Sequence, residues 1–274
     1  MKLTTKIIFG IILSIFAVSL IFIIGFSFSD RIHYQHRIIS NKISISQDNP
    51  IGLDINPFNV VVIEDDMKFG QVDVISSSSD ECSLTLYPIS SGKENKLFFP
   101  EALYSCIDAK TNDDTLKIII NFDELRKKYN VINHEYFSGI NFNLFTSRVN
   151  IINNVARFCI KVENIETDSI KIVSSGDILI ESCKAIIIEP VMDNSRRKLD
   201  VKNSVAKEIH LDLDGLRNWN LEECNIEIQN LTGSGRHNIT LDRNKAGKIN
   251  WYPKDEDAEL NIKVQGDTAQ IVFQ

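Results

Sequence analysis

Alanine and leucine are scarce in this chain of 274 residues, which holds 9 Ala and 20 Leu against 42 Ile. Alanine and leucine favour helices, whereas β-branched isoleucine suits a pleated, half-buried strand. The scarcity therefore argues against an all-helical protein. Disorder is excluded too, because a chain with 43% hydrophobic residues can bury a sizeable core.

Basic residues are outnumbered by acidic ones, and the formal net charge is -7. Residues 1–28 contain Lys2 and Lys6 but no acid, so the remainder is more acidic still. Such a surface is not drawn to nucleic acid or to anionic lipid by long-range attraction. We therefore expect no nucleic-acid partner.

The familiar catalytic and cofactor motifs are missing. The sequence has no Gly-x-Ser-x-Gly elbow, P-loop, dinucleotide fingerprint or His-Glu-x-x-His pair. We expect no catalytic residues and no cofactor, and interpret the chain as a non-enzymatic protein.

Cysteine is sparse, with an odd count of five and no Cys-x-x-Cys pair: Cys82, Cys106, Cys159, Cys183 and Cys224. Cys82 and Cys224 alternate with apolar neighbours, as small core residues do. We expect buried free thiols, and the alternative of a disulfide outside the cytoplasm stays open.

One long hydrophobic run is present, over residues 7–28, and it carries no charge across 22 positions. A helix of this length reaches about 33 Å, enough to cross a hydrocarbon core of about 30 Å. Lys2 and Lys6 favour a cytoplasmic N-terminus over residues 1–6. The alternative is a signal peptide cleaved near Ala17, but the apolar run continues too far beyond that position. We expect a single-pass anchor in a bacterial envelope, with a periplasmic or extracellular C-terminal domain.

Short alternating strands separated by turns follow the anchor. We assign residues 29–49 to a juxtamembrane linker and residues 50–274 to the ectodomain. Strands are expected at 60–63, 71–76, 82–87 and 116–121, with Pro and Asn marking the turns between them.

Residues 122–150 differ from their surroundings and read as an insertion. The stretch 123–129 has acids first and bases last, which complements a helix dipole, so one short helix is expected there. Phe137, Phe142 and Phe145 follow in an aromatic-rich connection. They either pack over one end of a core or form a partner-binding loop.

From residue 158 onward the alternation becomes regular, and eleven short strands are expected. Their apolar positions are 158/160/162, 170/172, 178/180, 186/188, 199/201, 209/211/213, 226/228, 239/241, 249/251, 260/262/264 and 271/273. The positions between them are mostly charged or Asn, so each strand has one dry face and one wet face.

Two all-β architectures satisfy this pattern. An antiparallel β-sandwich would need tight hairpins, yet only Asp214-Gly215 gives a typical hairpin signal. A right-handed parallel β-helix, or solenoid, needs no hairpins and stacks rungs of about 20–30 residues with Ile rows inside. We favour the solenoid and keep the sandwich as the alternative. The last strand, 269–274, would then be an edge that is covered or meets a partner.

The turns and strands resemble a known family. The resemblance is carried by residues 55–62, 72–76, 82–86, 113–118, 174–177 and 233–235. Together these stretches are similar to the autotransporter adhesin head domain family of bacterial envelope proteins. The resemblance covers about residues 50–274 and implies a membrane- or lipid-anchored β-helical domain without an assigned biochemical function. The chain departs from the family in having fewer Gly-Ser-Gly turns.

The best candidate constellation is His210, Asp212 and Asp214, which share one face of an expected strand. One imidazole and two carboxylates could hold a hard cation, or could supply an acid and a base. The simpler interpretation is a wet face that must be polar. A metal site would need a further ligand from a neighbouring rung, for which Glu208, Asp200 and Lys202 are candidates.

Three functions are compatible with these features. The first is a membrane-anchored protein whose β-solenoid binds or adheres to a protein or glycan partner. The second is an enzyme acting on polysaccharide through carboxylates aligned across rungs. The third is a structural scaffold in an envelope complex. We favour the first, with a strip of exposed aromatic or polar residues along adjacent rungs as the binding site.

Overall fold

A computed structural model describes residues 42–66, 81–89, 93–130, 136–192, 197–242 and 247–265. The expected anchor at 7–28, the strand at 71–76 and the last strand at 269–274 lie outside these ranges. Within them, no helix combines the length and the apolar character that a membrane crossing requires. The described residues belong to one compact unit that begins at Lys42.

Strands make up most of the described chain, with one α-helix and two 3-10 helices. In the first half these are β1 (Lys42–Ser44), β2 (Pro50–Ile55), β3 (Val60–Asp65), β4 (Cys82–Pro88), β5 (Asn95–Pro100), η1 (Glu101–Cys106), β6 (Ile107–Asn112), β7 (Thr115–Ile120), α2 (Phe122–Tyr129), β8 (Tyr136–Ser138), β9 (Ile140–Thr146) and β10 (Ile151–Asn154). In the second half they are β11 (Cys159–Glu163), β12 (Glu166–Ser174), β13 (Ile178–Glu181), β14 (Lys184–Met192), β15 (Arg197–Lys202), β16 (Val205–Asp212), η2 (Leu213–Gly215), β17 (Leu216–Glu222), β18 (Asn225–Gly233), β19 (Arg236–Asp242), β20 (Lys248–Pro253) and β21 (Glu259–Gln265).

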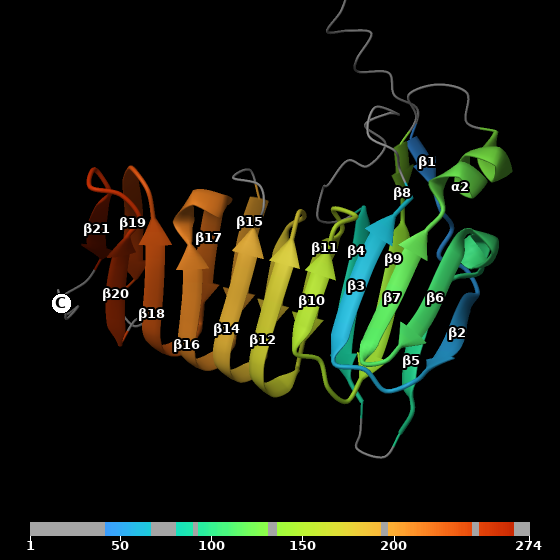
Figure 1. The fold of residues 1–274 in the computed structure, drawn as a ribbon, viewed down its shortest axis with the longest axis horizontal. Helices are drawn as coiled ribbons and strands as arrows, with labels where there is room; N and C mark the ends of the chain where they lie inside the picture. Colours follow the sequence, from blue (N-terminus) through green and yellow to red (C-terminus); the bar gives the residue numbers. More distant parts are fainter. Residues whose placement is uncertain are drawn as a thin grey trace, which may run out of the picture. The chain divides into compact units, whose positions relative to one another are not determined.

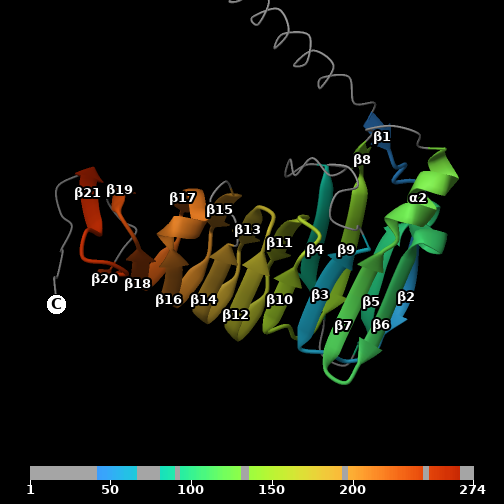
Figure 2. The same ribbon diagram turned by 45° about the horizontal axis from the view of Figure 1, so that its top comes forward.

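Two large sheets lie face to face (Figures 1 and 2). The nine-stranded sheet has the order β20-β18-β16-β14-β12-β10-β3-β7-β6, and the eight-stranded sheet has the order β17-β15-β13-β11-β4-β9-β5-β2. From β10 to β18 the chain passes from one sheet to the other at each successive strand. Each strand therefore pairs with the strand two places along the chain and not with its neighbour in sequence.

The expected all-β class is confirmed, and the sheets are mixed and not closed. Antiparallel pairs join β2 to β5, β5 to β9, and β6 to β7, all in the first half of the described chain. From β10 onward every pair is parallel. The antiparallel sandwich that we kept as an alternative does not fit this half, because it would pair neighbouring strands as hairpins.

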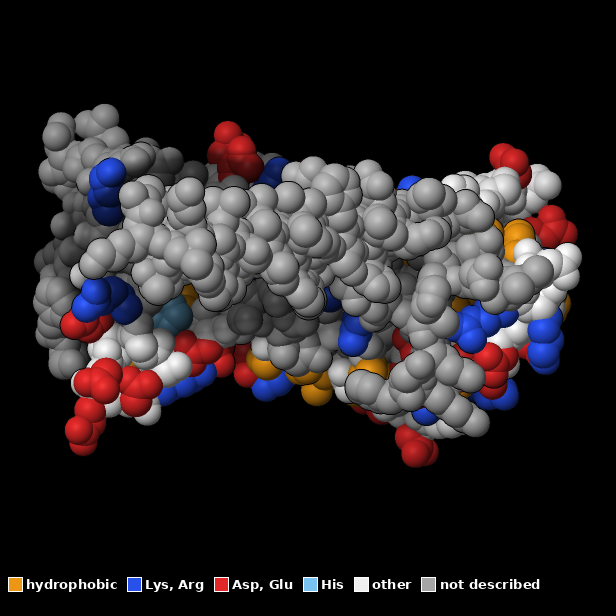
Figure 3. All heavy atoms as spheres, turned by 90° about the horizontal axis from the view of Figure 1, so that it is seen from above, with side chains coloured by type: hydrophobic (Ala, Val, Ile, Leu, Met, Phe, Trp, Pro, Cys, Tyr) orange, Lys and Arg blue, Asp and Glu red, His pale blue; other side chains and the backbone are white. Residues whose placement is uncertain are grey.

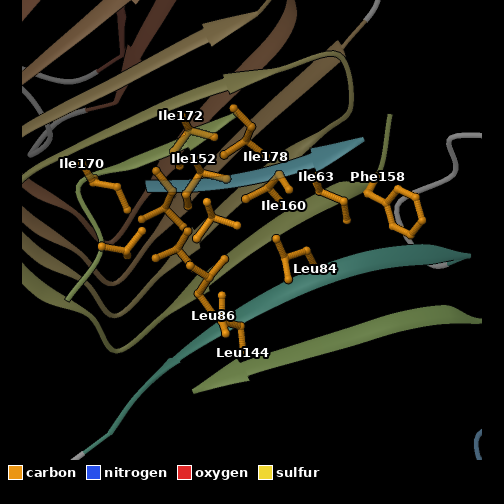
Figure 4. Close-up of a cluster of buried hydrophobic side chains, with 14 of the residues drawn as sticks. Ile63, Leu84, Leu86, Leu144, Ile152, Phe158, Ile160, Ile170, Ile172 and Ile178 are labelled. Carbon is orange, nitrogen blue, oxygen red and sulfur yellow. The ribbon is translucent and has the colours of Figure 1, made fainter. Parts of the chain in front are cut away.

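Inward-facing side chains of both sheets form a single hydrophobic core. Ile63, Ile152 and Ile172 of the nine-stranded sheet meet Leu84 and Ile160 of the eight-stranded sheet, and all five are fully buried (Figure 4). Burying apolar surface contributes about 25 cal/mol for each Å². The abundance of isoleucine is explained here, since the same residue type recurs in register from strand to strand.

The turns that leave the eight-stranded sheet repeat along the chain with a left-handed residue in each. These residues are Asn164 (φ 56°), Ser182 (φ 54°), Asn203 (φ 49°) and Glu223 (φ 52°). A residue with positive φ reverses the chain within very few residues. The turns at 182, 203 and 223 are followed by small buried residues, Cys183, Ser204 and Cys224.

All five cysteines are buried and free, as expected from the sequence. Lys184, Val205 and Asn225 are aligned in three neighbouring strands. The residues just before them, Cys183, Ser204 and Cys224, are therefore aligned in the same order, and the two cysteines are two strands apart. Two strand spacings amount to about 9.6 Å, too far for a disulfide. The two thiols instead donate to backbone carbonyls, at 3.4 Å to Val162 and 3.3 Å to Val201.

The expected short helix is confirmed as α2. The side chain of Asn121 caps it by accepting from the Glu124 amide at 2.9 Å, and Asn130 ends it with a left-handed φ of 53°. The boundary of the expected linker differs, because β1 pairs with β8 and Ile45 is buried. The described folded unit therefore includes residues 42–49, which we had assigned to the linker.

Candidate binding surface on the outer face of β16, β18 and β20

Three neighbouring parallel strands present aligned polar side chains on their outer face. Leu211 and Leu231 point into the core, so the residues on either side of each point outward. The register aligns His210 with Asn230 and Asn250, and it aligns Asp212 with Thr232 and Tyr252. We call these six residues the outer strip.

The first row of the outer strip is joined by hydrogen bonds. Asn250 Nδ2 donates to Asn230 Oδ1 at 2.8 Å, and Asn230 Nδ2 donates to Glu208 Oε2 at 3.2 Å. His210 Nε2 lies 3.1 Å from the same Glu208 oxygen. The hydrogen bond with His210 is the main reason why the pKa of Glu208 is lowered. The row is a fixed series of amide, carboxylate and imidazole groups.

The second row runs from Asp212 to Tyr252 and ends at an exposed aromatic ring. Tyr252 is 52% exposed, and it is one of the few large apolar side chains that the described residues leave open to solvent. Thr232 lies between Asp212 and Tyr252 in the register. The strip thus combines hydrogen-bonding groups with one accessible ring.

A cluster of charged residues borders the outer strip where β16, β18 and β20 end. Lys254 Nζ lies 2.6 Å from Asp212 Oδ1 and 2.9 Å from Asp214 Oδ2. His237 Nε2 lies 3.0 Å from Asp214 Oδ1. Seen from above, acidic and basic side chains lie side by side at the end of the sheet near β20, with a histidine among them (Figure 3). We call Asp212, Asp214, Ser234, His237 and Lys254 the Asp214 cluster.

Asp214 is held ionised within this cluster. Burial raises the pKa of its carboxyl, but hydrogen bonds outweigh that effect and the net pKa is lowered. Ser234 donates twice, from its backbone amide at 2.8 Å and from its hydroxyl at 2.9 Å. Lys254 and His237 add charge-assisted contacts. The pKa of Lys254 is raised, because the two carboxylates outweigh the effect of its own burial.

Glycine at position 233 makes room for the imidazole of His237. A Cβ at this position would lie 2.6 Å from His237 Nε2 and 3.1 Å from the ring of Trp251. The two rings meet edge to face, with centroids 6.1 Å apart. A larger residue at 233 would push His237 away from Asp214.

The candidate metal constellation of His210, Asp212 and Asp214 is not assembled. His210 contacts Glu208, whereas Asp212 and Asp214 contact Lys254, so the three side chains do not converge on one point. In the part of the chain that the structure describes, no group of three or more His, Cys, Asp or Glu residues could hold a metal ion. The positive charge facing the two carboxylates is the Lys254 ammonium.

Two of the three residues proposed as further ligands from a neighbouring rung lie elsewhere. Asp200 contacts Lys198 at 2.6 Å, and Lys202 contacts Glu222 at 3.4 Å, all on β15 and β17 of the eight-stranded sheet. Glu208 does lie beside His210, but as its hydrogen-bond partner.

The aromatic-rich connection expected at 137–145 consists of two strands, β8 and β9, and two of its three rings are unavailable to a partner. Phe137 and Phe142 are fully buried and pack against Phe122 and Phe158. Phe145 is half-buried on the outer face of β9. It stacks on Tyr87 with ring centroids 5.1 Å apart and meets Phe98 edge-on at 5.6 Å. Phe137 and Phe142 therefore pack in the core, the first of the two interpretations given above: Phe137 lies on β8, and β9 lies between β4 and β5 and turns Phe142 inward.

Several residues of the surface were not singled out from the sequence: Asn230, Thr232, Ser234, His237, Asn250, Tyr252 and Lys254. A signal for them was present. Partners in the outer strip and in the Asp214 cluster recur at an interval of 20 residues, as in Asn230 with Asn250 and Asp214 with Ser234. Adding this interval once and twice to the positions of His210, Asp212 and Asp214 finds six of these residues, all but His237.

No family model matches the chain, and no curated protein matches it. Several solved structures are similar to it, among them three from Bacteroides and Parabacteroides species. One, named "putative lipid binding protein" from Parabacteroides distasonis, has a TM-score of 0.45 at 10% identity and covers 85% of this chain and 100% of its own. Two are named "putative adhesin": one from Bacteroides fragilis (TM-score 0.44, 17% identity, 81% and 96% covered) and one from Parabacteroides merdae (0.40, 12%, 85% and 98%). At these values no shared function follows.

Proposed function

We propose that this chain is a non-catalytic binding protein of the bacterial cell envelope. Residues 7–28 span a membrane, residues 1–6 are cytoplasmic, and the β-structured domain stands in the periplasm or outside the cell. This domain presents the outer strip to a protein or glycan partner.

The proposed architecture of the domain is a right-handed β-solenoid over its second half. Its support is the alternation of successive strands between two sheets, with parallel pairing of every second strand from β10 to β18. Connections between parallel strands are right-handed in about 98% of cases, which favours the same hand here. Such a coil places equivalent residues of successive rungs side by side, as binding along a strip requires.

The observation that carries the proposal is the outer strip itself. Six outward residues on three strands are held in fixed positions by main-chain register, and they combine five hydrogen-bonding side chains with the exposed ring of Tyr252. A rigid scaffold lowers the entropy that binding costs. Exposed Tyr and Asn side chains are suited to recognition because they combine contact area with hydrogen bonding.

The electrostatics of the Asp214 cluster support a non-catalytic role. Cleavage of a glycosidic bond needs one carboxylic acid with a raised pKa beside an ionised partner. Here the pKa of Asp214 is lowered, so it remains a carboxylate, and the pKa of Lys254 is raised, so it remains an ammonium. Two carboxylates and a cation do meet, but as ion pairs in which neither Asp214 nor Lys254 is a general acid or base near neutral pH.

The test is binding by the full chain in detergent micelles to a glycan array and to proteins of a bacterial envelope extract. The variant Tyr252→Ala, alone and with Asn230→Ala, should lose at least about tenfold in affinity for whatever the native chain binds. Ile186→Ala is the control, because Ile186 is also a large exposed side chain (47%) but lies on β14, outside the outer strip. Arrays and extracts that stay empty, or a partner bound equally well by Tyr252→Ala, would contradict the proposal.

The anchor is tested separately. Alkaline carbonate washing of membranes should leave the full chain in the pellet, and its intact mass should include residues 1–28. A chain that is released, or that starts after Ala17, would show that the apolar segment is not an anchor.

A further inference from the structure

A second candidate site lies at the other end of the described fold, where β2, η1 and α2 meet (Figure 1). Here the surface is hollowed by a depression of about 530 Å³. Its lining residues are Ser46, Asp48, Ile51, Glu101, Ala102, Tyr104, Ser105 and Lys128. This volume lies within the range of about 300–1,000 Å³ that is common for small-molecule sites.

The 3-10 geometry of η1 directs two functional side chains to the same side. Residues three apart eclipse each other in such a helix. Leu103 and Cys106 form the buried side, and both are fully buried. Glu101 and Tyr104 therefore share another side, which lines the depression. The ring of Tyr104 is 60% exposed, so its face is accessible.

Hydrogen-bond donors and acceptors surround this ring. Asp48 and Glu101 supply carboxylate acceptors, and Ser46 and Ser105 supply hydroxyl groups. The Lys128 ammonium donates one proton to the Ala102 carbonyl at 2.6 Å and has two more to offer. Ser46 Oγ donates to Asp48 Oδ2 at 2.6 Å, which fixes that carboxylate. Ile51 and Ala102 add apolar surface.

This combination excludes most classes of ligand. An anion would meet the carboxylates of Asp48 and Glu101, and a cation would meet the Lys128 ammonium. An apolar ligand would have to strip water from three charged groups without replacing their hydrogen bonds. A neutral molecule that both donates and accepts hydrogen bonds, and has an apolar face for Tyr104, meets none of these penalties.

We propose that the depression lined by Asp48, Glu101, Tyr104 and Lys128 binds a neutral saccharide of one or two rings. A sugar ring lies with its C–H face on the Tyr104 ring. Its hydroxyls donate to the two carboxylates and accept from Lys128 and Ser105. This site is separate from the outer strip and does not depend on the function proposed for it.

The test is titration of the full chain in detergent micelles with glucose, galactose, N-acetylglucosamine, cellobiose and lactose, followed by saturation-transfer NMR. At least one of these saccharides should bind, and Tyr104→Ala should lower the affinity for it by at least about tenfold. Tyr104→Phe keeps the ring and should bind within about threefold of the native chain. Glu101→Gln keeps the shape but weakens the acceptor, and should reduce affinity several-fold.

Ile186→Ala, at an exposed position outside both sites, is the control and should leave this affinity unchanged. If none of the saccharides binds, or if Tyr104→Ala and Glu101→Gln both bind as the native chain does, the proposal is overturned. A saccharide whose binding is lost only in Tyr252→Ala would overturn it while supporting the outer strip. Inorganic phosphate and tetramethylammonium are tested in parallel, and tighter binding of either at Tyr104 would overturn the assignment to a neutral ligand.

Discussion

The ammonium of Lys254 lies 2.9 Å from Oδ2 of Asp214, which precedes it by 40 residues. Lys254 follows β20, whereas Asp214 follows β16, and Ser234 after β18 lies between them in the sheet order. One carboxylate thus joins the ends of three neighbouring strands. The Asp214 cluster therefore connects the ends of β16, β18 and β20, and it also borders the outer strip.

Replacing Asp214 should destabilise the domain. Asp214→Asn keeps the size of the side chain but removes the charge that three groups contact, and hydrogen bonds to a charged group contribute about 1.5–3 kcal/mol. Because the Asp214 side chain is 30% exposed, we expect a loss of about 1–2 kcal/mol in the free energy of unfolding, measured by urea denaturation. Asp168→Asn, at an exposed position on β12, is the control and should change stability by less than about 0.5 kcal/mol. Equal losses of stability in the two variants would show that the contacts of Asp214 do not stabilise the strand ends.

The contribution of Asp214 should depend on pH in one direction. Its pKa is lowered in the folded state, so its stabilisation is fully present above the unfolded value of about 3.9. It is lost as the pH falls through the lower, folded value. The stabilisation that the native chain gains over Asp214→Asn from this carboxylate should therefore be fully present at about pH 5 and shrink below about pH 4. A difference that grows on acidification would show that Asp214 is not ionised in the fold.

Alternation in the sequence predicted most of the strands correctly. Ten of the eleven strands expected from residue 158 onward lie in the described residues, and each corresponds to an observed strand. One observed strand in this half, β17, was not expected from the sequence. Its apolar residues Leu216, Trp219 and Leu221 do not alternate strictly, because the pairing shifts register at Arg197. The parallel pairing was favoured for the right reason, a lack of hairpin signals.

It was harder to predict which face of the sheet a side chain points to where a strand bends. We expected Ile186 and Ile188 to share one face, but Ile188 is fully buried and Ile186 is 47% exposed. Both Ile186 and Ile187 point outward, and the alternation resumes at Ile188. Local spacing cannot reveal such a bend, because it is set by the neighbouring strands. The partners of His210, Asp212 and Asp214 on and after β18 and β20 were missed for a similar reason, since contacts such as Asn230 with Asn250 and Asp212 with Lys254 join residues 20 and 42 positions apart.

The bend in β14 gives a matched pair of substitutions. Ile188→Ala should cost about 2–5 kcal/mol, because it removes buried methyl groups and leaves a cavity. Ile186→Ala changes the same residue type two positions earlier and should cost less than about 1 kcal/mol. Thermal and urea unfolding of both variants measure the difference. Equal losses would contradict the bend and would favour the uniform alternation expected from the sequence.

The parallel register can be tested by cross-linking. Glu166 and Lys184 are paired in neighbouring strands, and their side chains meet at 2.8 Å on the surface. Their Cα atoms should be about 4.8 Å apart, within the range for a disulfide. The double variant Glu166→Cys/Lys184→Cys should therefore oxidise readily, as read by peptide mapping. Glu166→Cys/Val205→Cys spans two strands, about 9.6 Å, and should not. Equal cross-linking of the two pairs would contradict this register.

Native thiols provide a final test of the core. All five cysteines are buried, and burial raises the pKa of Cys82 to about 11 and also raises that of Cys183. The thiolate is the reactive form, so a buried thiol with a raised pKa reacts slowly at pH 8. The folded full chain should react with Ellman's reagent at none of its five thiols within minutes, and at all five in urea. Ser204→Cys, which places a thiol between Cys183 and Cys224, should add a sixth that is equally protected. Rapid reaction at position 204 in the folded chain would show that the turn at 203–204 is open to solvent. It would contradict the burial of the aligned residues Cys183, Ser204 and Cys224.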